Sequence, residues 1–308
     1  MTGFRHVAVI GLGLQGGSIG LAVQAMLPGV RTSGFDLSPA HRARATERGL
    51  VEVVHDSAAG AVDGADLVIL CVPPGAMAEA ALAMAPGLAA DAVISDVGSC
   101  KVSVAEALAE ALPGHAAAGL IVPAHPVAGT ENSGPDAGFA ALFRNRWCIV
   151  TPLAGGDAAA AARVEAFWAG LGARVESMAP DHHDRVLAVT SHLPHLIAYT
   201  IVGTASDLEE VTQSEVIKYS AGGFRDFTRI AASDPTMWRD VFLANKGAVL
   251  EMLQRFTEDL TALQRAIRVE DGDALFEHFT RTRAVRRSII EMGQDDARAD
   301  FGRGDHQG

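Results

Sequence analysis

Polar residues that could act on a bound ligand follow two of the apolar runs of this 308-residue chain. Ser99 lies in the segment SDVGSCK, and His125 lies in the segment VPAHPVAGTENSG. Both segments come directly after runs that predict strands, and in an open α/β sheet the carboxyl ends of the strands form the edge where ligands bind. A serine and a histidine at this edge can share a hydroxyl group of a substrate. The residues alone leave open that Ser99 caps a helix and that His125 belongs to a turn.

A second candidate segment, TSHLPHLIAY, contains Ser191, His192 and His195 around a proline. Pro194 has no backbone N–H to donate to residue 190, so we expect the helix to kink or open there. Side chains at such a break can face a cleft. The alternative is a structural kink whose histidines are satisfied by neighbouring groups.

Charged residues are densest in the segment SAGGFRDFTRIAASDPTMWRDVFLANK. On a helix starting at Phe224, Arg225 and Arg229 would share a face, and Asp226 would lie one turn before Arg229. An arginine held by an aspartate suits the recognition of a carboxylate through two hydrogen bonds. A ladder of surface ion pairs is the alternative interpretation.

The N-terminal run VAVIGLGLQGGSIG places a glycine pattern between an apolar strand and a helix, which is the context of a dinucleotide-binding turn. Gly11 allows the tight turn, Gly13 lets a pyrophosphate approach the backbone, and Gly16 lets helix and strand pack closely. The helix then begins at Leu14 and offers its free N–H groups to the phosphates. A glycine-rich turn that binds no nucleotide remains the alternative.

Asp36 ends the next predicted strand, 20 residues after Gly16. A carboxylate at this place binds the ribose hydroxyls and repels a 2′-phosphate, so we expect NAD rather than NADP as the cofactor. Arg31 and Arg42 lie close in the sequence and leave the strictness of this choice open. Val72, Pro73 and Ser99, which follow later strands, are further candidates for cofactor contacts.

Alternating strand and helix patterns in the first 175 residues predict a Rossmann-type α/β fold, a doubly wound parallel sheet. After about Pro180 the strand pattern ends, and a period of 3.6 residues predicts an all-α helical domain. We expect an NAD-binding domain over 1–178, a helical substrate and dimerisation domain over 179–293, and a flexible tail over 294–308. The predicted strands are 7–10, 31–35, 67–71, 92–95, 119–122 and 147–150. The predicted helices include 14–27, 39–48, 75–85, 101–111 and 157–170, the last capped by Asp157.

Composition restricts the class of protein. Hydrophobic residues make up 49% and charged residues 20% of the chain, which is typical of a globular protein. The net charge of −12 disfavours a nucleic-acid partner, so an anionic substrate would need a local basic cluster.

Three scattered cysteines favour a reducing compartment and predict neither a disulfide framework nor a metal site. Because a strand starts by about residue 4 and no apolar run approaches about 20 residues, we expect a soluble, cytoplasmic protein without a membrane partner.

Four ordered segments, DVGSCK, HPVAGTENSG, SHLPH and GGFRDFTRIAASDPTMW, resemble the prephenate/arogenate (cyclohexadienyl) dehydrogenase family. The likeness extends from residue 7 to about residue 292. It implies an NAD-dependent oxidative decarboxylation in tyrosine biosynthesis. Hydride leaves C4 of the substrate ring for the nicotinamide, the 4-hydroxyl loses its proton, and the ring carboxylate departs as CO2. The product is 4-hydroxyphenylpyruvate from prephenate or tyrosine from arogenate.

The resemblance also implies roles for single residues. His125 matches the catalytic histidine that accepts a hydrogen bond from the 4-hydroxyl, and Ser99 matches the serine that shares this hydroxyl. Arg229 matches the arginine that binds a substrate carboxylate. The remaining residues expected to line the substrate pocket are Thr130, Glu131, Ser191, His195, Asp226 and Trp238. Helices of this family pack their apolar faces across a two-fold axis, so we expect a homodimer built through the helical domain.

Two other functions are compatible with the two-domain plan. A β-hydroxyacid dehydrogenase would rely on a lysine of the helical domain, for which Lys218 and Lys246 are candidates. A non-catalytic NAD-binding sensor would need no alignment of Ser99, His125 and Arg229. Formation of NADH with prephenate separates these possibilities, and no residue decides between prephenate and arogenate.

Overall fold

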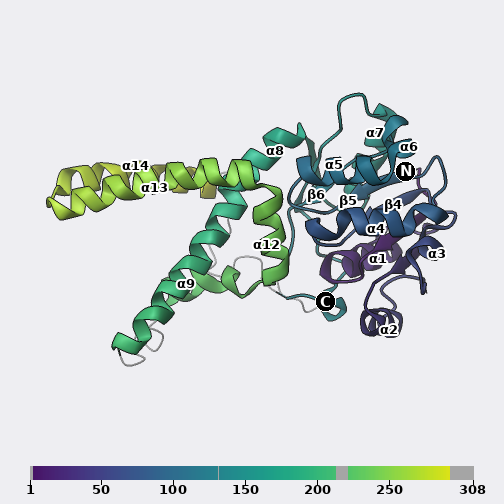
Figure 1. Cartoon of the computed structure of the whole chain (residues 1–308), viewed down its shortest axis with the longest axis horizontal. Coiled ribbons are helices and arrows are strands. Elements are labelled where there is room, and N and C mark those ends of the chain that lie inside the picture. Colours follow the sequence, from purple (N-terminus) through teal and green to yellow (C-terminus); the bar gives the residue numbers. More distant parts are fainter. Residues whose placement is uncertain (1–2, 131, 213–220, 292–308) are drawn as a thin grey trace. The chain divides into compact units, whose positions relative to one another are not determined.

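The computed structural model describes residues 3–130, 132–212 and 221–291, and it divides into two compact units between Leu250 and Glu251. The first unit contains a parallel five-stranded sheet with the strand order β3-β2-β1-β4-β5 (Figure 1). Its strands are β1 (His6–Ile10), β2 (Arg31–Phe35), β3 (Val53–Val54), β4 (Leu67–Leu70) and β5 (Val93–Asp96). The order reverses direction after β1, so the predicted Rossmann-type sheet is confirmed.

Alternation along β1 divides the core between the two faces of the sheet. Val7 and Val9 belong to one hydrophobic cluster, which includes residues of α1 and α7. Ala8 and Ile10 belong to a second cluster, which includes residues of α3, α4 and α5. Successive side chains of a strand point to opposite faces, so helices cover this sheet on both sides. These helices are α1 (Leu14–Met26), α2 (Pro39–Glu47), α3 (Ala58–Val62), α4 (Met77–Met84), α5 (Val102–Ala111), α6 (Pro113–Ala117) and α7 (Ala158–Gly170).

The predicted helices begin and end close to the observed ones. Asp157 caps α7 as expected, because its side chain accepts a hydrogen bond from the N–H of Ala159. The predicted helix over 75–85 divides into a 3₁₀ turn, η1 (Pro74–Ala76), followed by α4.

A second, three-stranded sheet follows the first, with the order β6-β7-β8. Its strands are β6 (Ala124–Pro126), β7 (Trp147–Val150) and β8 (Arg174–Ser177), and β6 is antiparallel to β7. The strand expected over 119–122 is reduced to a single bridge between Ile121 and Ile94. Pro123 comes next and has no N–H to continue this ladder, so the chain leaves β5 and pairs with β7 instead. His125 therefore lies within a strand.

No strand follows Ser177 among the described residues, in agreement with the predicted helical part. The remaining described elements are α8 (Pro180–Leu187), a π-helical turn η4 (Ala188–His192), α9 (Leu193–Thr212), α11 (Gly222–Thr228), a 3₁₀ turn η5 (Arg229–Ala232), α12 (Pro235–Ala244), α13 (Lys246–Arg268) and α14 (Gly272–Glu291). The second compact unit begins within α13, so α8 to α12 group with the sheets. The domain boundaries proposed at residues 178 and 293 stay predictions.

One continuous helical run, Pro180–Asp207, is long and apolar enough to cross a membrane by length and composition alone. The sequence had led us to expect no such segment. A single helix of this kind is a weak indication, because the core helix of a soluble protein passes the same test. The run also contains Asp184, whose carboxylate contacts the first residues of α5.

Candidate active site

The glycine turn has the geometry that a dinucleotide requires. Gly11 has a φ of +100°, and a Cβ there would lie 2.5 Å from the carbonyl oxygen of Cys71. A Cβ on Gly16 would collide with the carbonyl oxygen of Gly11. Gly13 differs, because the nearest atom to its Cβ position is 3.9 Å away. Gly11 and Gly16 thus shape the turn, while Gly13 leaves open space before Leu14, the first residue of α1.

Asp36 joins the end of β2 to the glycine turn. Its carboxylate accepts hydrogen bonds from the N–H of Leu12 and the N–H of Ser38, each at 2.9 Å. Arg42 donates to the backbone carbonyl oxygen of Asp36 at 2.9 Å, so its guanidinium group lies next to the backbone at this position.

Val72 and Pro73 follow β4 at the same edge of the sheet. A Cβ on Gly11 would lie 3.1 Å from a methyl carbon of Val72, so Val72 packs beside the glycine turn. Pro73 is exposed.

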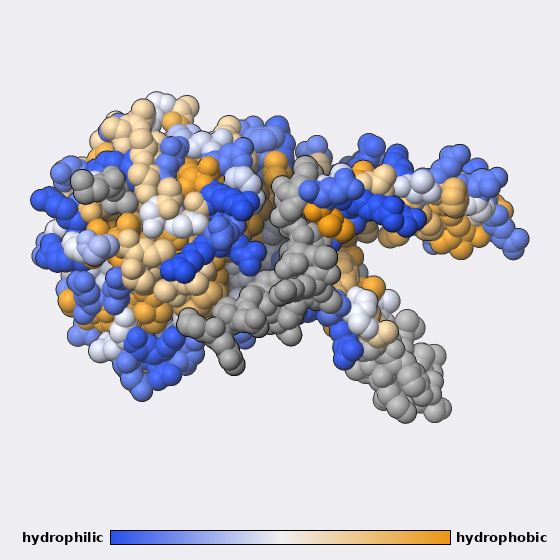
Figure 2. Space-filling view, turned by 180° about the vertical axis from the view of Figure 1, so that it is seen from behind, coloured by the Kyte–Doolittle hydropathy of each residue, from blue (hydrophilic) through white to orange (hydrophobic). Residues whose placement is uncertain are grey.

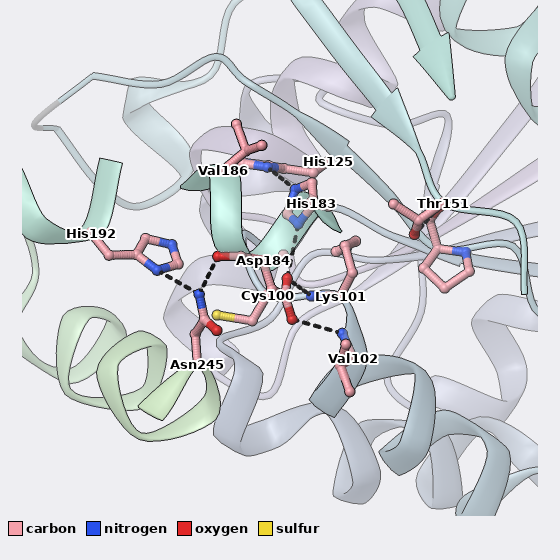
Figure 3. Close-up of polar contacts among 12 residues, drawn as sticks. Cys100, Lys101, Val102, His125, Thr151, His183, Asp184, Val186, His192 and Asn245 are labelled. Atoms are coloured by element: carbon pink, nitrogen blue, oxygen red, sulfur yellow. Dashed lines mark hydrogen bonds and ion pairs between the residues drawn. The ribbon is translucent and has the colours of Figure 1, made fainter. Parts of the chain in front are cut away.

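His125 is the first member of a chain of buried polar groups (Figure 3). Its Nδ1 lies 2.9 Å from Nε2 of His183, and Nδ1 of His183 lies 2.9 Å from Oδ1 of Asp184. Burial lowers the pKa of His125 well below its ordinary value, and the charges of His183 and Lys101 act in the same direction. At neutral pH the imidazole of His125 is therefore uncharged and can accept a proton.

Asp184 is anchored at the N-terminus of α5. Its two carboxylate oxygens accept hydrogen bonds from the N–H groups of Lys101 (2.7 Å) and Val102 (3.0 Å). Burial acts to raise the pKa of Asp184, but hydrogen bonds from His183, Lys101 and Val102 hold it below its usual value. Lys101, the N-cap residue of α5, makes no capping hydrogen bond with its own side chain. A carboxylate at this place satisfies free N–H groups and interacts favourably with the helix dipole.

A buried ion pair joins the end of β5 to the beginning of β6. The ammonium group of Lys101 contacts the carboxylate of Asp96 and donates to the carbonyl oxygen of Ala124 at 2.7 Å. Asp96 in turn accepts from the N–H of Ala124 at 3.3 Å. Ser99 is half-buried in the loop between Asp96 and Lys101, and His125 follows Ala124 directly. The two predicted catalytic residues therefore lie on segments that Lys101 holds together.

A second group of predicted residues surrounds Trp238. The ring of His195 stacks on the indole of Trp238, with 3.6 Å between ring centroids, and its Nδ1 donates to the carbonyl oxygen of Ser191 at 2.9 Å. The helix does not break at Pro194, but it widens into a π-helical turn that ends at His192, close to the position where the sequence predicts a kink or an opening. Burial lowers the pKa of His195, and the nearby positive charge of Arg229 adds to this effect.

Other predicted residues do not belong to these two groups. Thr130 and Asp226 are exposed, and Glu131 and Lys218 lie outside the described residues. The hydroxyl of Thr130 accepts from the N–H of Asn132 at 3.2 Å. Arg225 lies in α11, which ends at Thr228, and Arg229 begins the adjoining 3₁₀ turn η5, so the shared face of Arg225 and Arg229 stays a prediction.

The sequence analysis missed Lys101, His183, Asp184 and Asn245. Asn245 donates to the carbonyl oxygen of Asp184 at 2.8 Å and lies 3.1 Å from Nδ1 of His192. The only signal for the acid and histidine was the run DHHD at the beginning of α8. Among the residues that the structure describes, no group of three or more histidine, cysteine or acidic side chains is arranged to hold a metal ion.

Comparisons with known proteins cover nearly the whole chain. The sequence model described as the nucleotide-binding domain of prephenate dehydrogenase matches residues 19–177, and the one described as its dimerization domain matches residues 179–281. Cyclohexadienyl dehydrogenase of Zymomonas mobilis is 48% identical over 94% of this chain and 97% of its own length. Prephenate dehydrogenase of Bacillus subtilis is 34% identical over 91% of this chain and 75% of its own length.

Similar solved structures include prephenate dehydrogenase of Aquifex aeolicus in complex with hydroxyphenyl propionate and NAD+. It has a TM-score of 0.85 and 32% sequence identity, and the match covers 92% of this chain and 98% of that one. The likeness therefore includes both the sheet and the helical part that follows it.

Proposed function

The chain belongs to the prephenate dehydrogenase family, and we propose that it uses His125 as the base in the NAD-dependent oxidative decarboxylation of prephenate or arogenate. The observation that carries this role is the buried, uncharged imidazole of His125 at the end of a hydrogen-bonded chain. A neutral imidazole can accept the proton of the 4-hydroxyl, which becomes acidic as hydride leaves the same carbon. The activity itself follows from the family and its relatives.

The glycine turn fits NAD, which when bound accepts the hydride from C4 of the ring. Gly13 and the N-terminus of α1 offer space and N–H groups to the pyrophosphate, and Asp36 would bind the ribose hydroxyls. We propose that Val72, Pro73 and the loop of Ser99 complete this site. The C4–H bond supplies the hydride, and the hydroxyl proton moves to His125 as the carbonyl forms. The electron pair of the bond to the ring carboxylate then enters the ring as CO2 leaves, and the aromatic phenolate oxygen takes the proton back from His125.

We propose that Arg229, half-buried near the stacked pair of His195 and Trp238, binds a substrate carboxylate. A cation on the departing ring carboxylate would stabilise a charge that disappears in the transition state, which would slow the reaction. Arg229 therefore serves better by holding the side-chain carboxylate, which stays charged throughout. Ser99 would share the 4-hydroxyl with His125. The proposed pocket also includes Thr130, Glu131, Ser191 and Asp226.

We also propose that the protein acts as a homodimer in the cytoplasm. Figure 2 shows hydrophobic side chains gathered along one side of the α13–α14 hairpin. On the two helices of this hairpin, Leu260, Phe276 and Phe279 are 53%, 72% and 56% exposed. Large apolar side chains that are exposed together are typical of an interface between protein chains. The description of the matching helical region as a dimerization domain supports the same assembly.

The deciding experiment measures NADH and CO2 formation by the purified full-length protein with prephenate and, separately, with arogenate. We expect equal amounts of both products with at least one substrate. NADH formation without CO2, or with a β-hydroxyacid in place of both substrates, would contradict the proposal. His182→Asn, which changes an exposed histidine of α8, is the matched control for all histidine variants.

A further inference from the structure

We propose that Asp184 and His183 act as a relay that sets the tautomer of His125, so that its Nε2 is the proton acceptor. His183 is then a positioning residue that acts through His125. The inference rests on the proposed function, because it concerns the residue that we assign as the base. Its basis is the direction in which each hydrogen bond of the chain must run (Figure 3).

The direction is fixed first at Asp184. A carboxylate only accepts hydrogen bonds, so Nδ1 of His183, at 2.9 Å from Oδ1, must carry the proton. Burial lowers the pKa of His183, so its imidazole is neutral near pH 7 and has one N–H and one lone pair. Nε2 of His183 is therefore an acceptor.

The second step follows from the contact between the two rings. Nδ1 of His125 lies 2.9 Å from Nε2 of His183, and only a proton on Nδ1 makes this contact a hydrogen bond. The other tautomer of His125 would turn two lone pairs toward each other in a buried site, which leaves both groups unsatisfied. The relay thus leaves a lone pair on Nε2 of His125.

The fold holds this relay rigidly. Asp184 is bound by three donors, the N–H groups of Lys101 and Val102 and Nδ1 of His183. The side chain of Asn245 also fixes the backbone carbonyl of Asp184 at 2.8 Å. His183 is fully buried with both ring nitrogens engaged, so it is not placed to touch a substrate itself. The contacts with Asp184 and His125 therefore account for a buried histidine at position 183.

The first test reads the tautomer directly. Nitrogen-15 NMR of histidine-labelled protein, with the signals of His125 assigned by their loss in His125→Asn, reports which ring nitrogen carries the proton. We expect Nδ1 protonated and Nε2 unprotonated at neutral pH. A proton on Nε2 would overturn the relay, even if His125 is the base.

Two variants of His183 separate the relay from a structural role. An asparagine amide can take the place of Nδ1 and keep the bond to Asp184, but it loses the contact with His125. A glutamine amide can take the place of Nε2 and keep an acceptor for His125, but it loses Asp184. We expect His183→Asn to lower kcat about 10²-fold or more, within the range of a general base. His183→Gln should retain clearly more activity, and His182→Asn should match the wild type.

The reverse order, with His183→Asn more active than His183→Gln, would show that His183 only secures Asp184 and would overturn the relay. Thermal unfolding and the Kd for NAD in each variant identify any loss of fold. If instead His125→Asn keeps its kcat, the proposed function of His125 fails, while the NMR result still decides the tautomer. The two failures are therefore distinguishable.

Discussion

At the scale of single residues, His125 combines burial with a neutral charge state. Because its folded pKa is lowered by burial and by His183, Lys101 and His192, the deprotonated form predominates at and below the ordinary imidazole pKa. The rate that depends on a deprotonated base rises with pH through the folded pKa and is constant above it. We therefore expect kcat/KM to be flat around pH 7 and to fall only at pH values below about 6.5.

His125→Asn should remove this acidic limb and lower kcat about 10²- to 10⁴-fold, with a modest change in KM. Steady-state kinetics across pH measures both quantities. A wild-type limb centred above the ordinary imidazole pKa would assign the titration to another group.

Arg229 should act mainly in binding, because the carboxylate that it meets is charged before the reaction begins. Loss of a charge-assisted pair costs about 2–5 kcal/mol when the pair is buried, so Arg229→Ala should raise KM for the substrate steeply. The Kd for NAD should stay unchanged. Arg239→Ala, which removes an exposed arginine of α12 paired with Asp240, is the control and should alter neither value. A weaker Kd for NAD in Arg229→Ala would contradict the assignment.

Asp36 provides the test of cofactor choice. Its carboxylate, at the end of β2, should repel the 2′-phosphate of NADP, so the wild type should show the higher kcat/KM with NAD. Asp36→Ala should lower the ratio of the NAD to the NADP value. The same variant also removes the acceptor for the N–H groups of Leu12 and Ser38, so the ratio, and not either value alone, is the informative quantity. A wild-type preference for NADP would refute the role of Asp36.

The sequence indicated His125, Ser99 and the glycines because each follows a run that predicts a strand, although His125 itself lies within β6. It could not indicate the relay, because His183 is 58 residues from His125 and Asp184 is 83 residues from Lys101. Only the tertiary fold brings such residues together. The functional roles of the predicted site residues stay predictions until these variants are measured.

At the scale of elements, α5 depends on a cap from a distant helix. Asp184→Ala would leave the N–H groups of Lys101 and Val102 and Nδ1 of His183 without their acceptor in a buried place. We expect the free energy of unfolding to fall by about 2–4 kcal/mol, since each unsatisfied buried donor costs about 1–3 kcal/mol and some relax. Urea unfolding measures the loss. Asp181→Ala, on an exposed turn of the same helix α8, should change the stability far less, and equal losses would refute the capping role.

The helices and strands differ in how clearly the sequence pattern predicts them. Buried strands such as β4 are continuous apolar runs, and the sequence placed them within a residue or so. It missed β8, whose residues are largely exposed, and β3, which has two residues. It also predicted a strand over 119–122, where the structure has only a single bridge to β5. The pattern could not show that Pro123 ends this pairing and that β6 pairs with β7. Local pattern identifies burial, whereas pairing depends on partners far along the chain.

At the scale of the whole molecule, a monomer would leave the apolar side of the α13–α14 hairpin exposed to water. We expect a dimer by light scattering at micromolar concentration. Leu260→Glu places a charge on this side and should shift the protein to monomers. Leu82→Glu is a matched control, because Leu82 of α4 is 59% exposed and Leu260 is 53% exposed, yet only Leu260 lies on the hairpin. Dissociation by both variants, or a wild type that is already monomeric, would show that the hairpin does not form the interface.

If the dimer forms through this hairpin, Leu260→Glu should also leave the Kd for NAD unchanged, since the glycine turn belongs to the other compact unit.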